Sequence, residues 1–342
     1  MKIELTQIIP QIDADLHTSW QKDLREVITE PEKLLKMLNI APEDYKQHFK
    51  ARKLFPVRVP KPFINRMKKG DVNDPLLKQV MPLKEEFVVT EGFSQDPLQE
   101  HASAIEGLLH KYKSRVLMIV KPGCAINCRY CFRRHFPYQE NSPNKQRWQQ
   151  ALTYIGEHKE ISEVIFSGGD PLMASDEHLT WLVEQIEAIP HIKRLRFHTR
   201  LPVVIPNRIT TAFTSLLKNS RLKTTIVLHI NHSNEIDADF AKALEPLRKA
   251  CIPLFNQSVL LNGINDNADA LITLSENMFD IGIVPYYLHL FDQVQGAAHF
   301  DVCEEKAINI AKDMLAALPG FLMPTLVREI AGEPNKTPIN LT

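Results

Sequence analysis

Short apolar runs rich in β-branched and aromatic residues recur through the chain and alternate with segments of helical periodicity. The runs begin at residues 115, 163, 194, 224, 253 and 283. Their spacing of roughly 30 residues is the length of one strand-helix unit. Between them, segments such as 176–186 and 237–247 place apolar residues every three or four positions, as an amphipathic helix does. The pattern predicts an α/β protein with a partial (βα)6 barrel and, by analogy with the full barrel, chemistry at the carboxyl ends of the strands.

The two ends of the chain show different patterns. Residues 1–105 have helical periodicity near 21–28 and 31–38, followed by a turn-rich stretch with several prolines and lysines. We predict a helical N-terminal cap over 1–105, the barrel over 106–320 and a polar, turn-rich C-terminal segment over 321–342.

Composition and charge exclude several classes of protein. Hydrophobic residues make up 44% of the chain and charged residues 24%, which is typical of a globular protein and not of a disordered one. Basic and acidic residues both number 41, so no overall charge would attract nucleic acid. No apolar stretch is long enough to span a membrane and the N-terminus lacks an apolar signal core, so we expect a cytoplasmic protein without membrane or nucleic-acid partners.

Three cysteines, Cys124, Cys128 and Cys131, follow the first apolar run within eight positions. Three thiolates can bind three irons of a 4Fe-4S cluster and leave the fourth iron open, whereas an electron-transfer cluster is usually closed by a fourth cysteine. This C-x3-C-x2-C spacing, with an aromatic residue at Tyr130, is the signature of radical S-adenosylmethionine (SAM) enzymes, in which SAM chelates the open iron.

The alternative for the cysteines is a structural zinc site, which requires a fourth tight ligand. The candidates for that ligand are His135, Cys251 and Cys303. Paired C-x2-C units are more typical of closed zinc sites than this spacing. An odd number of cysteines also argues against a disulfide framework and fits a reducing compartment.

A glycine pair ends the second apolar run, in Ser167-Gly168-Gly169-Asp170. Glycines permit a close backbone approach that a Cβ atom would prevent. In radical SAM enzymes, a turn at this position, one strand-helix unit after the cysteines, contacts the methionyl amino group of SAM, and the resemblance implies the same contact here. Taken alone, the turn is equally compatible with an ordinary loop between a strand and a helix.

The sequence resembles the lysine 2,3-aminomutase family, in particular the short bacterial form that makes β-lysine for modification of elongation factor P. The resemblance is carried, in order, by segments beginning at Cys131, Ser167, His198, Asn231, Asn256, Pro285 and Lys336. It covers about residues 115–338. It implies that the chain isomerises L-lysine to (R)-β-lysine with a 4Fe-4S cluster, SAM and pyridoxal 5'-phosphate (PLP), alongside an external electron donor and the ligase that attaches β-lysine to the factor.

The same resemblance implies a role for particular residues. It assigns PLP to Lys336 in a Lys-Thr-Pro motif and the PLP phosphate to Arg115, with Lys111 as a further candidate. It assigns SAM to Ser167, Gly168, Gly169, Asp170 and Gln257. It assigns the substrate carboxylate to Arg133, and the ε-ammonium of lysine to Asp292 and Glu329. An arginine fork for a carboxylate and carboxylates for an ammonium are the expected pairings.

Two departures from the family pattern stand out. Glu329 occupies a position that is normally aspartate, which lengthens that side chain by one methylene. Asn267 occupies the barrel position of a zinc-ligating cysteine found in longer members, so we expect no zinc. Two other functions remain open from the sequence: a radical SAM aminomutase for another amino acid, such as glutamate, and a non-catalytic iron-sulfur protein.

Overall fold

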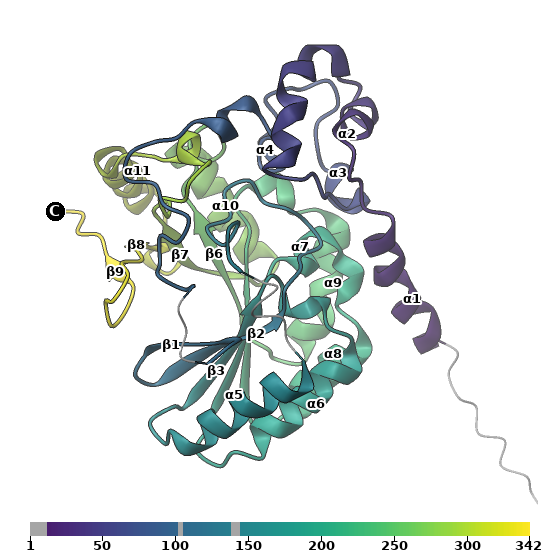
Figure 1. Ribbon diagram of the computed structural model, residues 1–342, viewed down its shortest axis with the longest axis vertical. Helices are drawn as coiled ribbons and strands as arrows, with labels where there is room; N and C mark the ends of the chain where they lie inside the picture. Colours follow the sequence, from purple (N-terminus) through teal and green to yellow (C-terminus); the bar gives the residue numbers. More distant parts are fainter. Residues whose placement is uncertain (1–11, 102–104, 138–143) are drawn as a thin grey trace, which may run out of the picture.

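A nine-stranded sheet forms the centre of the protein in the computed structural model, which describes residues 12–101, 105–137 and 144–342 (Figure 1). The strands follow one another across the sheet in sequence order. They are β1 (Leu108–Tyr112), β2 (Arg115–Lys121), β3 (Glu163–Gly168), β4 (Arg194–Thr199), β5 (Lys223–Leu228), β6 (Leu254–Val259), β7 (Val284–His289), β8 (Thr325–Arg328) and β9 (Thr337–Pro338). Strands β2 to β8 are parallel, and the edge strands β1 and β9 are antiparallel to their neighbours.

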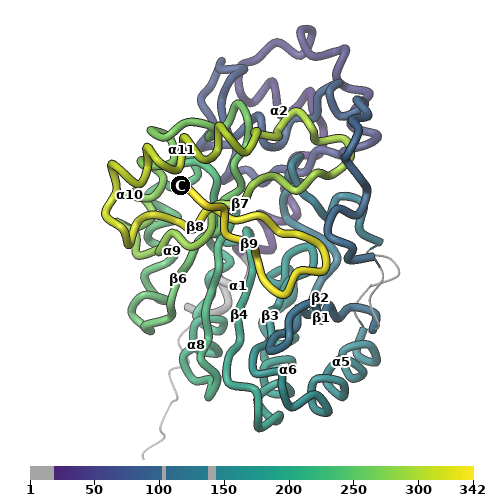
Figure 2. Tube along the Cα trace, turned by 90° about the vertical axis from the view of Figure 1, so that its left-hand side faces the viewer, coloured from purple at the N-terminus to yellow at the C-terminus, as the bar shows by residue number. Residues whose placement is uncertain are grey.

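The six apolar runs correspond to β2 through β7, which confirms the repeated strand-helix unit. The structure adds a seventh parallel strand, β8, and an antiparallel hairpin partner, β9. Both form within the C-terminal segment, for which the sequence predicted only turns. In Figure 2, β8 lies beside β7, and the chain after β8 folds back so that β9 lies beside β8.

Helices connect the strands and cover the outer face of the sheet (Figure 1). The longer ones are α5 (Lys145–Glu157), α6 (Asp176–Glu187), α8 (Thr211–Asn219), α9 (Ala238–Lys249), α10 (Ala268–Asp280) and α11 (Glu304–Ala317). Short helical turns are η3 (Pro171–Met173), α7 (Leu201–Val204), η4 (Pro206–Arg208), η5 (Ser233–Glu235), η6 (Ala298–Phe300) and η7 (Gly320–Leu322). Side chains that cap a helix start, such as Ser175 for α6 and Asp237 for α9, explain where the helices begin.

Along a strand, alternate side chains point either into the hydrophobic core under the helices or to the inner face of the sheet. In β4, Leu195 and Phe197 are buried among outer-face side chains, and Phe197 packs edge-on against Phe166 of β3 at 5.2 Å. Arg196 and His198, at the alternate positions, line a cavity on the inner face. Since successive strand residues point to opposite faces, the polar positions within apolar runs are those that enter the cavity.

The N-terminal region packs beside the cysteine loop. Its helical segments are α1 (Ile12–Arg25), α2 (Pro31–Met37), η1 (Pro42–Lys53), α3 (Lys61–Ile64), α4 (Pro75–Lys78) and η2 (Lys84–Phe87). The Arg129 amide donates to the Gln79 carbonyl at 2.9 Å, and Arg58 Nε donates to the Cys124 carbonyl at 2.9 Å. These bonds fix the cysteine loop from outside the sheet. In the part of the chain described, no helix has the length and apolar character needed to cross a membrane.

Candidate active site

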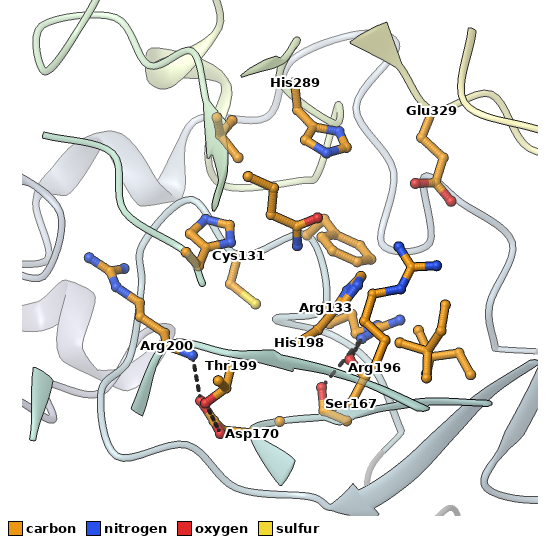
Figure 3. Close-up of a pocket in the computed structure, with 18 of the residues that line it drawn as sticks. Cys131, Arg133, Ser167, Asp170, Arg196, His198, Thr199, Arg200, His289 and Glu329 are labelled. Carbon is orange, nitrogen blue, oxygen red and sulfur yellow. Dashed lines mark hydrogen bonds between the residues drawn. The ribbon is translucent and has the colours of Figure 1, made fainter. Parts of the chain in front are cut away.

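The inner face of the sheet borders a cavity of about 560 Å³ (Figure 3). It extends from the beginnings of β2 to β4, at Arg115, Glu163 and Arg194, to the cysteine loop beyond their carboxyl ends. A volume of this size can enclose small-molecule ligands.

Side chains bridge the two edges of the sheet at this cavity. The Tyr112 hydroxyl of β1 donates to Glu329, which follows β8, at 3.1 Å. Lys111 Nζ, also from β1, lies 3.5 Å from the same carboxylate. Polar contacts thus span the gap between the first strand and the last pair of strands.

The cysteine loop brings Cys124, Cys128 and Cys131 to the cavity. Burial raises the pKa of Cys124 well above its usual value and that of Cys131 to about 11, and negative charge from neighbouring groups, including the other sulfurs, adds to both shifts. Such thiols need a bound cation to become thiolates.

Three sulfurs at one cavity can share a single metal ion or bind a multinuclear cluster. A single zinc ion would need a fourth tight ligand beside them. A 4Fe-4S cluster instead binds each thiolate to a different iron. The fourth ligands considered for zinc lie elsewhere: Cys251, Cys303 and His135 are exposed, and none of them lines the cavity.

Arg200, which the sequence analysis did not single out, anchors one cysteine. Its Nη1 lies 2.7 Å from Cys128 Sγ and also donates to the Tyr130 hydroxyl. Its Nη2 pairs with Glu235 at 2.9 Å and donates to Gln79 at 2.8 Å. This buried guanidinium therefore links the cysteine loop at Cys128 to Tyr130, Glu235 and Gln79.

The glycine pair after β3 packs against the cysteine loop. A Cβ atom on Gly168 would lie 2.5 Å from the Lys121 carbonyl oxygen, and one on Gly169 would lie 2.6 Å from that of Gly123. Gly168 also has φ +124°, which disfavours other residues. The close approach expected of these glycines is therefore made to the loop that presents the cysteines.

The remaining residues predicted to bind SAM differ in their surroundings. Asp170 lines the cavity, but its carboxylate accepts four hydrogen bonds, from the Thr199 hydroxyl and the Leu172, Arg200 and Leu201 amides, at 2.7 to 3.0 Å. It therefore holds the end of β4 in place. Ser167 and Gln257 line the cavity from β3 and β6.

Lys336 faces the cavity from the hairpin that joins β8 and β9. It forms an ion pair with Glu329, and its Nζ lies 5.8 Å from the centre of the Tyr287 ring. Its side chain is 19% exposed. An amine that is shielded from bulk water and reachable from the cavity fits covalent attachment of PLP.

The beginnings of β2 to β4 supply an excess of positive charge. Arg196 donates to Glu163 at 2.7 Å, and Arg194 lies 3.6 Å from the same carboxylate. Arg115 lies over the Tyr112 ring at 4.1 Å. Three guanidinium groups with one carboxylate leave a net positive charge that could bind a phosphate ester. Arg115 remains the predicted phosphate ligand, and Arg194 and Arg196 were not predicted.

Asp292 and Glu329, the two predicted ammonium ligands, both line the cavity but have very different pKa values. Loss of bulk water raises the pKa of Asp292 to about 7, and repulsion from Glu329 adds to this shift. Although burial opposes the change, the Lys336 and Lys111 cations lower the pKa of Glu329 to about 2. Glu329 is therefore ionised at neutral pH, whereas the Asp292 carboxyl holds its proton to a higher pH than an ordinary aspartate.

Arg133 and Lys111 share a carboxylate from the N-terminal region. Arg133 Nε lies 2.6 Å from Glu100 Oε2, and Lys111 Nζ lies 2.8 Å from Glu100 Oε1. Lys111, a candidate for the PLP phosphate, thus contacts Glu100 and Glu329. Glu100 itself gave no signal in the sequence, because no motif surrounds it.

Three histidines also line the cavity without having been predicted. They are His198, His229 and His289, and the buried Nε2 atom of each has no hydrogen-bond partner among the described residues. Loss of bulk water lowers the pKa of all three, to about 3 for His229, so the rings are neutral. Neutral imidazoles can donate or accept a hydrogen bond from a ligand.

A parallel sheet with three cysteines after its first parallel strand is the arrangement expected of a radical SAM protein. A model of the Radical SAM superfamily matches residues 118–274, from β2 to α10. Members of this class use a 4Fe-4S cluster and SAM.

More specifically, the chain belongs to the L-lysine 2,3-aminomutase family. It is 55% identical over 323 residues to the L-lysine 2,3-aminomutase of Escherichia coli (strain K12), covering 94% of each chain. It is 56% identical to that of Haemophilus influenzae, covering 93% of this chain and 95% of the relative. The enzyme of Clostridium subterminale is 33% identical, with 96% and 79% covered.

Proposed function

We propose that this protein isomerises L-lysine to (R)-β-lysine by moving the amino group from Cα to Cβ. The observation that carries the substrate assignment is the placement of Arg133, Asp292 and Glu329 around one cavity with the cysteines and Lys336. Sequence identity of 55% and 56% over nearly the full length of two bacterial relatives named L-lysine 2,3-aminomutase supports the same reaction.

The bound groups would divide the chemistry between them. When bound, the cluster and SAM would supply radical chemistry for removing hydrogen, and PLP would supply a π-system over which an unpaired electron can delocalise. Cys124, Cys128 and Cys131 would hold the cluster, with Arg200 beside Cys128. Lys336 would hold PLP, with its phosphate near Arg115.

The protein itself positions the substrate. Arg133 would bind the substrate carboxylate, while Asp292 and Glu329 would bind the distal ammonium. The ion pair that Glu329 forms with the Lys336 ammonium supports its assignment to an ammonium group of the substrate. Ser167, Gln257 and the backbone at Gly168 and Gly169 would border SAM, and Asp170 would maintain the strand end behind it.

A direct assay tests this proposal. Anaerobic, reduced protein with SAM, PLP and L-lysine should yield β-lysine, and chiral chromatography should identify the (R) form. L-glutamate should not react, because its distal carboxylate would face Asp292 and Glu329. Turnover of glutamate, or the absence of β-lysine from protein with a full cluster and bound PLP, would contradict the proposal.

We further propose that β-lysine, the product, is attached to elongation factor P. An external electron donor would reduce the cluster. The support is the resemblance to the short bacterial form. Adding β-lysine to cells that lack this protein should restore the modified factor, as measured by mass spectrometry. Modification that is normal without the protein would sever this link.

Replacing Asp292 with alanine should weaken transition-state binding of lysine by about 2 to 4 kcal/mol, because the substrate ammonium loses a partner in a shielded pocket. The measurement is kcat/KM for lysine, with iron and PLP content determined on the same sample. Asp280→Ala, at the exposed end of α10, is the matched control. If Asp292→Ala turned over lysine as the wild type does, Asp292 would not bind the substrate ammonium.

The Asp292 carboxyl also predicts a pH dependence. Its pKa is raised to about 7, so the ammonium-binding carboxylate is gained as pH rises through that value. The KM for lysine should therefore fall between about pH 6 and about pH 8. Asp292→Asn should flatten this part of the profile, and an unchanged slope in that variant would assign the titration to another group.

Glu329→Asp should weaken the use of lysine or change the product ratio. The substitution restores the usual family residue but withdraws the carboxylate by one methylene from Lys336, Lys111 and Tyr112. Chiral analysis of the product and kcat/KM would measure both effects. Activity and product ratio equal to those of the wild type would show that this length does not matter here.

A further inference from the structure

Glu100 lies at the junction of the cavity and the N-terminal region, and nothing in the sequence pattern pointed to it. It is only 5% exposed. Its two oxygens contact Arg133 at 2.6 and 3.2 Å, through Nε and Nη2, and one of them also contacts Lys111 at 2.8 Å. A carboxylate is thus buried between two cations, one of which is the predicted ligand of the substrate carboxylate.

The segment that carries Glu100 is attached to the loop that carries Asp292. The Ser94 amide donates to the Gln293 carbonyl at 3.0 Å, and the Gln295 amide donates to the Ser94 carbonyl at 2.8 Å. Nearer to Glu100, the Asp96 carboxylate accepts hydrogen bonds from the Glu100 and His101 amides at 2.8 and 2.9 Å. These bonds fix the backbone of Glu100 relative to the cavity.

The contacts of Glu100 determine how Arg133 is oriented. Glu100 binds the Nε–Nη2 side of the guanidinium, while Nη1 donates to Ser167 at 3.1 Å and to the Gly168 carbonyl at 3.4 Å. Two-point contact with a carboxylate sets the plane of an arginine fork as well as its position. The orientation of Arg133 therefore depends on a residue outside the barrel.

The charges in this group support an ionised Glu100. Burial opposes ionisation, but Arg133 and then Lys111 lower the pKa of Glu100 below its ordinary value. Lys111 Nζ lies 2.8 Å from the Glu100 carboxylate and 3.5 Å from that of Glu329, so its closer partner is Glu100. Glu100 thus offsets two positive charges next to the substrate pocket.

We propose that Glu100 is a positioning residue that acts through Arg133 to orient the carboxylate of the amino-acid substrate. The inference rests on the proposed function, since it requires an amino acid that Arg133 binds. It assigns to the N-terminal region a part in substrate specificity: that region completes the carboxylate end of a pocket whose other parts come from the barrel and the C-terminal hairpin.

The test compares two ligands that differ in the group on which Glu100 is proposed to act. L-lysine has the carboxylate, and 1,5-diaminopentane has the same chain and amines without it. Equilibrium dialysis of oxidised holoenzyme, with cluster, SAM and PLP bound and no reductant, gives both dissociation constants without turnover. For Glu100→Gln we expect the ratio of the lysine constant to the diaminopentane constant to rise about tenfold or more, because misplacing a binding group by about 1 Å has effects of this size.

Two further variants keep the test decisive. Glu100→Asp retains the charge but shortens the side chain, so it should show an intermediate ratio even if Glu100→Gln does not fold. Glu91→Gln, at an exposed position of the same region, should leave both constants unchanged. In kinetic assays, Glu100→Asp should raise KM for lysine more than it lowers kcat.

Three results would overturn the inference. Equal weakening of both ligands would indicate a general structural role, and no change in either would remove Glu100 from recognition. Tighter lysine binding by Glu100→Gln would mean that Glu100 repels the substrate carboxylate. If the wild-type holoenzyme binds diaminopentane but not lysine, the proposed function fails at Arg133 before Glu100 is tested.

Discussion

Replacing Cys128 with alanine will abolish both the 4Fe-4S cluster and reductive cleavage of SAM. Cys128 is one of three sulfurs at the cavity, and Arg200 lies 2.7 Å from it. With two thiolates left, a second iron lacks a protein ligand and the cluster does not persist. Anaerobic reconstitution followed by iron and sulfide analysis, with measurement of 5'-deoxyadenosine, should show loss of both signals.

Cys303→Ala is the matched control for that experiment. Cys303 is exposed at the start of α11 and does not line the cavity, so this variant should retain iron and SAM cleavage. Normal iron content with normal cleavage in Cys128→Ala would contradict the cluster assignment.

Replacing Lys336 with alanine will prevent covalent attachment of PLP and abolish formation of β-lysine. Lys336 lies at the cavity wall, with its Nζ 5.8 Å from the centre of the Tyr287 ring, and it pairs with Glu329. The other lysine of the cavity, Lys111, pairs with Glu100 and Glu329, and other types of side chain do not form an imine with PLP. Borohydride reduction of the wild type, followed by peptide mapping, should place the cofactor label on the peptide that contains Lys336.

The control for Lys336 is Lys312→Ala, on the exposed side of α11, which should retain the label and activity. Cluster content should be unchanged in Lys336→Ala, since Lys336 and the cysteines come from opposite ends of the sheet. A label on another lysine would remove Lys336 from its proposed role. Loss of the cluster together with PLP would indicate a folding defect instead.

Local patterns account for what the sequence predicted well. Strands β2 to β7 were predictable because each buries apolar residues on its outer face, as Leu195 and Phe197 do in β4. The cysteine loop was predictable because its ligands lie close together in sequence and follow a strand. The location of Lys336 at the cavity could be expected only through the resemblance to a family, since a lysine in a polar tail has no distinguishing local pattern.

Contacts between distant segments account for what was missed. Strand β8 has four residues with exposed ends, so its pairing with β7 depends on the sheet already present. Glu100 and Arg133 are 33 positions apart and belong to no common motif. The unpartnered Nε2 atoms of His198 and His289 become visible only when the two strands face one cavity.

Only the structure explains why glycine is needed at positions 168 and 169. Their position after β3 favoured contact with SAM, but the atoms a Cβ would meet belong to Lys121 and Gly123. Likewise, Asp170 is a polar residue at a strand end, and only its four hydrogen bonds show that the carboxylate supports the backbone around Arg200. Sequence thus located this part of the site without assigning its contacts.

The central claim is that one cavity holds lysine close enough to SAM for a hydrogen atom on its Cβ to be exchanged between them. Anaerobic turnover of L-lysine deuterated at both Cβ positions tests it most directly, with mass spectrometry of the SAM and 5'-deoxyadenosine recovered from the reaction. The account predicts deuterium at the 5' carbon of both molecules and in the β-lysine formed. β-Lysine that forms while both molecules remain free of deuterium would contradict it.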